Sequence, residues 1–121
     1  KPKDHVRQNL IEGVIAPNAS VLVVEDLIST GMSSLQAVQA VREVPAKVVG
    51  VAAIFQYGLP KADRAFADAN CPFMTLTDFK TIIDVAAKEK RIEQHHLELL
   101  HHWSEDPQAW SERFLENSTL T

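Results

Sequence analysis

Two neighbouring carboxylates and a short loop of small polar residues are the part of this sequence best suited to chemistry. Glu25 and Asp26 come directly after Val21–Val24, an apolar run that predicts a buried strand. The loop Ser29–Ser33 follows two more apolar residues and leads into a helical pattern. Ligands of open α/β sheets bind at the carboxyl ends of the strands. We therefore expect a ligand site where this strand ends.

The loop itself has the composition of an anion site. Ser29, Thr30 and Ser33 supply hydroxyls, and Gly31 supplies flexibility. The helical pattern that begins after the glycine leaves backbone N–H groups unpaired at the positive end of a helix dipole. Carboxylates that can hold a polyol, beside a cradle for a phosphate, indicate a sugar phosphate as the ligand.

This run resembles the phosphoribosyl-pyrophosphate (PRPP) motif of the type I phosphoribosyltransferases, in both order and spacing. The resemblance implies that Glu25 and Asp26 hydrogen-bond the ribose hydroxyls and that the loop wraps the 5′-phosphate. Mg²⁺ would be held mainly through PRPP, with no direct protein ligand. The implied PRPP-binding residues are Glu25, Asp26, Leu27, Ile28, Ser29, Thr30, Gly31, Met32 and Ser33.

A second resemblance concerns the start of the chain. Lys3, Asp4 and His5 match the Lys-Asp-His-Gly sequence in the flexible catalytic loop of orotate phosphoribosyltransferases, with Val6 in place of the glycine. In that family the loop closes over the site of the neighbouring subunit, which implies a homodimer. Lys3 and His5 would be catalytic, because they stabilise the negative charge that builds on the departing pyrophosphate.

Two downstream segments resemble the bacterial branch of the same family. They are the Phe-x-Tyr-Gly-Leu turn within 55–60 and the Thr-Leu-Thr element within 75–79. The resemblance covers nearly the whole chain, most firmly residues 1–85. It implies that Ser29 and Tyr57 contact orotate, although other branches place an arginine near the position of Tyr57.

The implied function is transfer of a phosphoribosyl group from PRPP to orotate, giving orotidine 5′-monophosphate and pyrophosphate in UMP biosynthesis. Two alternatives remain open. A purine-type phosphoribosyltransferase would keep Glu25 and Asp26 but lack the upstream lysine and histidine. A non-catalytic PRPP-binding regulatory module would favour loss of Lys3 and His5. A third possibility is that the chain is inactive by itself.

Composition limits the class of protein. The 121 residues suffice for one domain, and 45% hydrophobic with 23% charged residues is typical of a soluble globular protein. A net charge of −4 argues against a nucleic-acid partner. Cys71, the single cysteine, fits a reducing cytoplasm, and no apolar stretch is long enough to span a membrane.

Apolar patterns alternate between strands and helices, which predicts an α/β fold: a Rossmann-like parallel sheet flanked by helices, as in type I phosphoribosyltransferases. Expected strands lie near 11–15, 21–24, 48–55 and 73–76, with 48–55 covered on both faces. Expected helices span 32–44, start at Pro60, follow a Thr77 cap, cover about 92–103, and start at Pro107. We expect a loop remnant and lead-in at 1–19, the core at 20–116 and a frayed tail at 117–121. The sheet is thin and the chain lacks an initiator methionine, so we expect the C-terminal part of a longer protein.

A group of histidines invites a metal interpretation. On a helix, His95, Glu98 and His102 would share one face, as metal ligands do. However, His96 continues the apolar stripe of this helix, and a bare two-histidine spacing is a weak signal. Surface or packing roles are favoured, and no metal is assigned.

Overall fold

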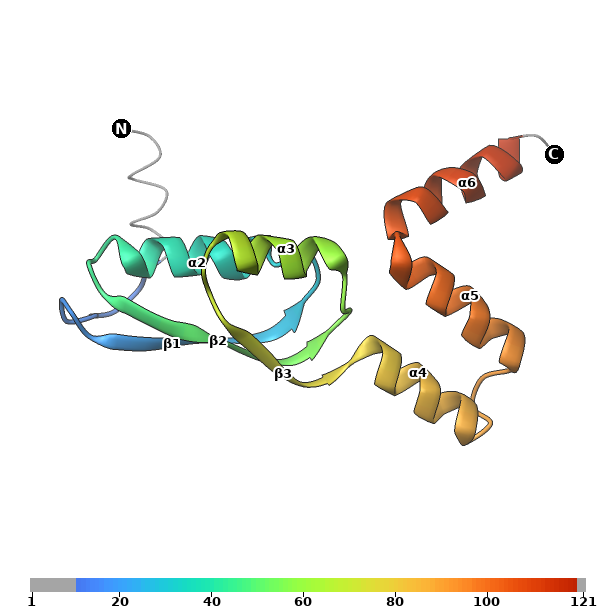
Figure 1. Ribbon diagram of the computed structural model, residues 1–121, viewed down its shortest axis with the longest axis horizontal. Helices are drawn as coiled ribbons and strands as arrows, with labels where there is room; N and C mark the ends of the chain where they lie inside the picture. The colour runs from blue at the N-terminus through green and yellow to red at the C-terminus, as the bar shows by residue number, and fades with distance from the viewer. Residues whose placement is uncertain (1–10, 120–121) are drawn as a thin grey trace.

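The computed structural model describes residues 11–119 as three strands and five helices (Figure 1). Lys3, His5 and Val6 lie outside the described residues, so the expectations about them stay predictions. In chain order the elements are β1 (Ser20–Ile28), α2 (Met32–Arg42), β2 (Lys47–Gln56), α3 (Pro60–Asp68), β3 (Phe73–Asp78), α4 (Phe79–Lys88), α5 (Gln94–Glu105) and α6 (Pro107–Thr119).

The three strands form one parallel sheet in the order β1-β2-β3. Ile28, the last residue of β1, is opposite Gln56, and Gln56 is opposite Asp78 at the end of β3. The carboxyl ends of all three strands therefore share one edge. Helices α2 and α3 run across one face of the sheet (Figure 1). The expected parallel α/β arrangement is confirmed.

The core lies between the sheet and these two helices. Phe66 of α3 is its largest fully buried side chain, with 1% of its surface exposed. The Phe66 ring stacks on Phe73 of β3, with ring centroids 4.3 Å apart. Ile28, Val38 and Val51 add one buried side chain each from β1, α2 and β2. This packing fixes α2 and α3 against the strands whose ends carry the candidate site.

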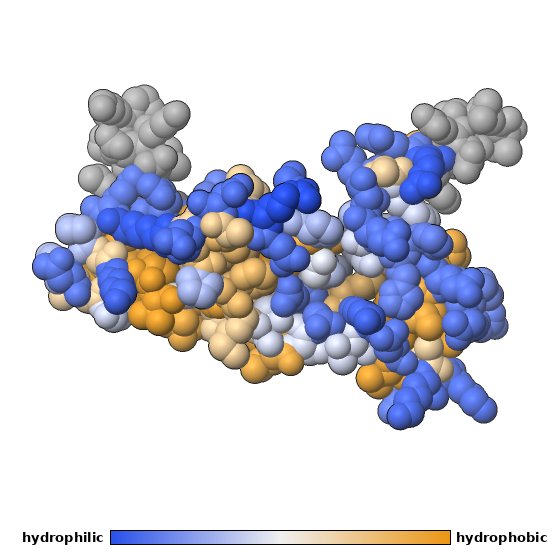
Figure 2. All heavy atoms as spheres, viewed as in Figure 1, coloured by the Kyte–Doolittle hydropathy of each residue, from blue (hydrophilic) through white to orange (hydrophobic). Residues whose placement is uncertain are grey.

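The other face of the sheet carries apolar side chains that no element in the described range covers. Ile54 of β2, for example, is 58% exposed, so the expectation that 48–55 is covered on both faces is wrong. The reason is that α2 and α3 lie on the opposite face, while α4, α5 and α6 extend away from the sheet (Figure 1). Figure 2 shows apolar surface over the strand region of the molecule. The exposed apolar residues of this open face are Leu22, Val24, Ile54, Met74 and Leu76.

Several element boundaries also differ from expectation. Residues 11–15 form no strand. The first strand continues past Val24 to Ile28, because Glu25 and Leu27 pair with Ala53 and Phe55 of β2. The first helix ends at Arg42 instead of Val44. The last helix starts at Pro107 as expected and extends into the segment 117–121.

The cap of α4 is Asp78 and not Thr77. Thr77 is still paired with Phe55 in the sheet, whereas Asp78 Oδ1 accepts a hydrogen bond of 2.8 Å from the Thr81 amide. A carboxylate at this position satisfies an N–H group that the helix leaves unpaired. The same hydrogen bond from the Thr81 backbone lowers the pKa of Asp78 from its usual value of 3.8.

Aromatic contacts attach α4 and α5 to the shared edge of the sheet. Tyr57, just after β2, has its ring centroid 5.7 Å from that of Phe79 in α4 and 5.6 Å from that of Trp103 in α5. The ring centroids of Phe79 and Trp103 are 5.3 Å apart.

Within the described range, no helix has both the length and the apolar character needed to cross a membrane.

We predict that Asp78→Ala lowers the free energy of unfolding by about 1 kcal/mol at pH 7, the usual effect of losing a helix N-cap. Because the pKa of Asp78 is depressed in the folded chain, this stabilisation is present above the unfolded pKa and is lost as the pH falls through the folded pKa. Urea unfolding at pH 7 and near pH 2 measures the difference. Asp68→Ala, which removes an exposed carboxylate at the end of α3, is the matched control and should change stability by less than about 0.5 kcal/mol. A loss that did not depend on pH would contradict the capping role.

Candidate functional site

Glu25 and Asp26 lie in the second half of β1. Successive side chains of a strand point to opposite faces, so Glu25 shares the helix-covered face with Val23, while Asp26 is on the open face. Glu25 is half-buried and Asp26 is exposed. The two carboxylates therefore reach the edge of the sheet from different sides, and a ligand that contacts both must lie across the end of the strand.

The loop after β1 is shaped by Gly31. This residue is the N-cap of α2 and has φ +85°, a conformation that favours glycine. A Cβ atom at Gly31 would lie only 2.8 Å from Cε2 of the buried Phe66 ring. The turn into α2 therefore needs a glycine for two separate reasons, backbone conformation and space.

The start of α2 leaves donors available to a ligand. No side chain caps this helix. The Leu35 amide donates a hydrogen bond of 3.0 Å to the Gly31 carbonyl, which is the first backbone hydrogen bond of the helix. The amides of 32–34 precede that bond and have no partner within the helix. The Ser34 hydroxyl is also buried and unpartnered among the described residues. Because the Ser34 side chain is 1% exposed, the features of this helix start that suit an acceptor such as a phosphate oxygen are its backbone amides.

The predicted PRPP set ends at Ser33, and the next residue, Ser34, has a side chain that is 1% exposed. Ile28, which the set included, has a side chain that is 1% exposed and belongs to the core. It can contribute to a ligand site only through its backbone.

Tyr57 lies beside this loop, since its amide donates to the Ile28 carbonyl over 3.1 Å. Its ring is half-buried and meets the Phe55 ring edge-on at 5.1 Å. The structure thus brings the turn after β2 next to the loop after β1. This is the adjacency that the predicted contact of Ser29 and Tyr57 with one substrate requires.

A cavity of about 320 Å³ opens at the same edge of the sheet. Its polar lining combines two carboxylates with Lys80 and His101, and His101 Nε2 lies 3.3 Å from Asp84 Oδ1. Sequence reasoning missed this cavity because α5 contributes part of it from far along the chain. The lining residues are Gln56, Tyr57, Gly58, Asp63, Asp78, Lys80, His101 and Ser104.

The histidines of α5 do not gather as the spacing of His95, Glu98 and His102 suggested. His95 Nδ1 lies 3.2 Å from Glu93 Oε2, and His102 Nδ1 lies 3.8 Å from Glu105 Oε2. His96 is exposed, so its assignment to the apolar stripe is wrong. The cavity at the edge of the sheet is lined by His101 and not by His95, His96 or His102.

Comparisons with known proteins agree with this geometry. The orotate phosphoribosyltransferase of Bacteroides fragilis is 48% identical to this chain over 109 residues, which are 90% of the chain and 51% of that protein. The solved orotate phosphoribosyltransferase of Mycobacterium tuberculosis, in complex with inorganic phosphate, is 36% identical and superposes with a TM-score of 0.51 over 59% of this chain and 40% of its own. No protein-family profile matches the chain.

A more distant structure supports the fold alone. The UMP synthase of Leishmania donovani superposes with a TM-score of 0.66 over 77% of this chain and 21% of its own, at 17% identity. The parallel sheet, the loop at its edge and these similarities define a type I phosphoribosyltransferase fold. The curated relatives that the chain matches are orotate phosphoribosyltransferases, and the chain spans about half of their length.

We predict that Gly31→Ala destabilises the chain more than Gly13→Ala. Both glycines have positive φ, +85° and +99°, so each alanine suffers backbone strain of roughly 1–2 kcal/mol. Only at Gly31 does the new Cβ also meet the Phe66 ring, whereas nothing lies within 4 Å at Gly13. Urea unfolding measures both variants, and equal losses would show that Phe66 does not constrain the loop.

Proposed function

We propose that this chain forms the PRPP-binding part of an orotate phosphoribosyltransferase. The observation that carries the proposal is the 48% identity to the Bacteroides fragilis enzyme across 90% of the chain. The geometry after β1 supports it, because a glycine-dependent turn with free helix amides stands beside Glu25 and Asp26. The purine-type and regulatory alternatives have no observation in their favour.

The 5′-phosphate of PRPP binds the amides at the start of α2. These N–H groups and the positive end of the helix dipole suit a phosphate. Glu25 and Asp26 accept hydrogen bonds from the ribose hydroxyls across the end of β1. The phosphate bound to the Mycobacterium tuberculosis relative is in keeping with an anion site in this family.

Mg²⁺ would be held mainly through PRPP, with no direct protein ligand. The two carboxylates near the loop lie on opposite faces of β1, so they do not form a protein cage for the ion. A hard cation that keeps water and substrate oxygens needs no such cage. When bound, the ion would supply positive charge that offsets the negative charge of the pyrophosphate.

Orotate binds beside Ser29 and the turn at Tyr57. In the reaction, a nitrogen of orotate forms a bond to C1 of the ribose while the bond from C1 to pyrophosphate breaks. Lys3 and His5 stabilise the negative charge on the departing pyrophosphate, and the loop that carries them excludes water. The resemblance of residues 3–5 to the catalytic loop implies that this loop serves the site of a second subunit, and the active form is therefore a homodimer. Its proposed location is the cytoplasm.

We predict that Asp26→Asn weakens PRPP binding to this chain by about ten- to a hundredfold, the effect of losing a charged hydrogen-bond partner. Calorimetric titration of the chain with PRPP and Mg²⁺ measures the affinity. Asp68→Asn removes an exposed carboxylate at the last residue of α3, outside the predicted PRPP-binding residues, and should leave binding unchanged. Equal affinities of the wild type and Asp26→Asn would remove this residue from the ribose site.

A second prediction concerns turnover. In a chimaera in which this chain replaces the matching half of the Bacteroides fragilis relative, Lys3→Ala and His5→Ala should lower kcat at least about a hundredfold, with a much smaller effect on PRPP binding. The reason is that both side chains act on charge that develops in the transition state. Loss of orotate absorbance measures the rate.

The same assay tests the substrate. Turnover of adenine or hypoxanthine, with none of orotate, would refute the proposal. The chain alone is expected to show little turnover, since the resemblance implies that further elements complete the base pocket. Near-normal orotate turnover by the chain alone would show that this expectation is wrong.

A further inference from the structure

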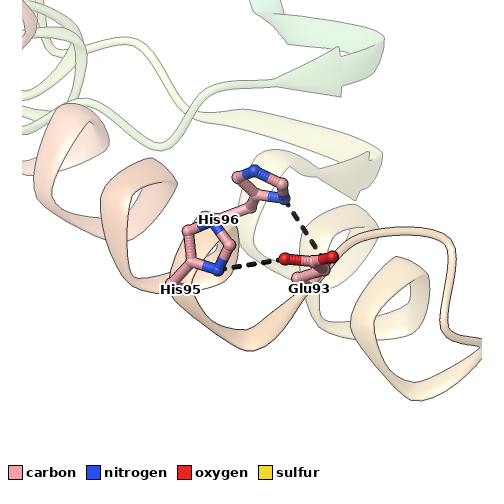
Figure 3. A group of neighbouring side chains, drawn as sticks. All are labelled: Glu93, His95 and His96. Atoms are coloured by element: carbon pink, nitrogen blue, oxygen red, sulfur yellow. Dashed lines mark hydrogen bonds and ion pairs between the residues drawn. The ribbon is translucent and has the colours of Figure 1, made fainter.

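Three side chains with metal-binding atoms gather where α5 begins (Figure 3). Glu93 immediately precedes the helix, and His95 and His96 lie in its first turn. One carboxylate oxygen and one nitrogen from each imidazole lie within 4.8 Å of one another. All three residues are exposed, so an ion in solution can reach them. None of them lines the cavity at the sheet edge.

One pair of these atoms already has the spacing found around a coordinated metal, while the others lie within 4.8 Å. Glu93 Oε2 and His95 Nδ1 are 3.2 Å apart. In a tetrahedral site with bonds of roughly 2.0–2.1 Å, two ligand atoms are separated by about 3.3 Å. The two imidazole rings have centroids 4.1 Å apart and planes inclined at 46°, so neighbouring residues that would normally diverge on a helix turn their rings together.

Hydrogen bonding holds this arrangement in place. The Glu93 amide donates to His96 Nδ1 over 3.4 Å, which keeps the His96 ring beside the start of the helix (Figure 3). That bond is long, so little is lost when a metal ion takes the same lone pair. The second nitrogen of each ring remains free to donate to water.

Charge makes the carboxylate essential. The N-terminal end of a helix is positive and opposes a cation. Glu93 supplies the negative charge that offsets this effect, and the imidazoles supply nitrogen donors, which suit zinc, copper and nickel better than magnesium. The cluster is therefore unlike the PRPP-dependent magnesium site, which uses oxygen donors.

We propose that Glu93, His95 and His96 form a surface site for one Zn²⁺ ion, with water completing the tetrahedral coordination. The site joins the residue before α5 to the first turn of that helix, so bound zinc fixes the start of α5. The proposal is independent of the phosphoribosyltransferase reaction.

Calorimetric titration of the 121-residue chain with ZnCl₂ alone tests the site. We expect one saturable site, whose affinity falls at least about tenfold in each of His95→Ala, His96→Ala and Glu93→Gln. His102→Ala is the matched control, because it removes an exposed histidine of the same helix that lies outside the cluster, and it should leave the affinity unchanged. A tenfold excess of Mg²⁺ should not displace the zinc.

Nuclear magnetic resonance of the imidazole nitrogens gives a second readout that does not depend on folding of the variants. Zinc should shift the ring resonances of His95 and His96 but not those of His101 and His102. The proposal is overturned if zinc shows no saturable binding, if His102→Ala weakens binding as much as His95→Ala, or if the shifts fall on the other histidines.

Discussion

The contact between the Phe66 ring and the backbone of Gly31 links the core of this protein to its candidate site. The Phe66 ring stacks on Phe73, and it leaves no room for a side chain at Gly31. The glycine therefore keeps its positive φ, and α2 begins directly after the loop without a side-chain cap. Because the core fixes where α2 begins, it also fixes the free amides that suit a phosphate.

The parallel register has an equally direct effect on the site. The last residues of β1, β2 and β3 are opposite one another, so the polar segments that follow them meet at one edge of the sheet. The hydrogen bond from the Tyr57 amide to the Ile28 carbonyl extends this alignment by one residue beyond β2. A substrate with a phosphate, a sugar and a base needs contacts at several points along such an edge, and adjacent strand ends supply them.

The fold was predictable because apolar residues repeat at the spacing of strands and helices. The site was less predictable because it depends on contacts between residues that are far apart in the sequence. The strands and helices are short-range features, and the run Val21–Ser33 carries both its strand and its loop within a few residues. The exposure of Ile54 was not predictable, because an apolar strand looks the same in sequence whether one face or both are covered. The rings of His95 and His96 converge through side-chain rotation, which the spacing of residues along a helix does not reveal.

The aromatic contact between Tyr57 and Trp103 shows how α5 becomes part of the site. Trp103 packs against both Tyr57 and Phe79, so α5 is anchored at the end of β2 although the helices beyond β3 extend away from the sheet. That anchoring brings His101 and Ser104 to the wall of the cavity. These ring contacts hold α5 together with the polar contact of 3.3 Å between His101 Nε2 and Asp84 Oδ1 of α4. Helix α5 therefore shapes the cavity at this edge through packing, beside the loop after β1 with its free helix amides.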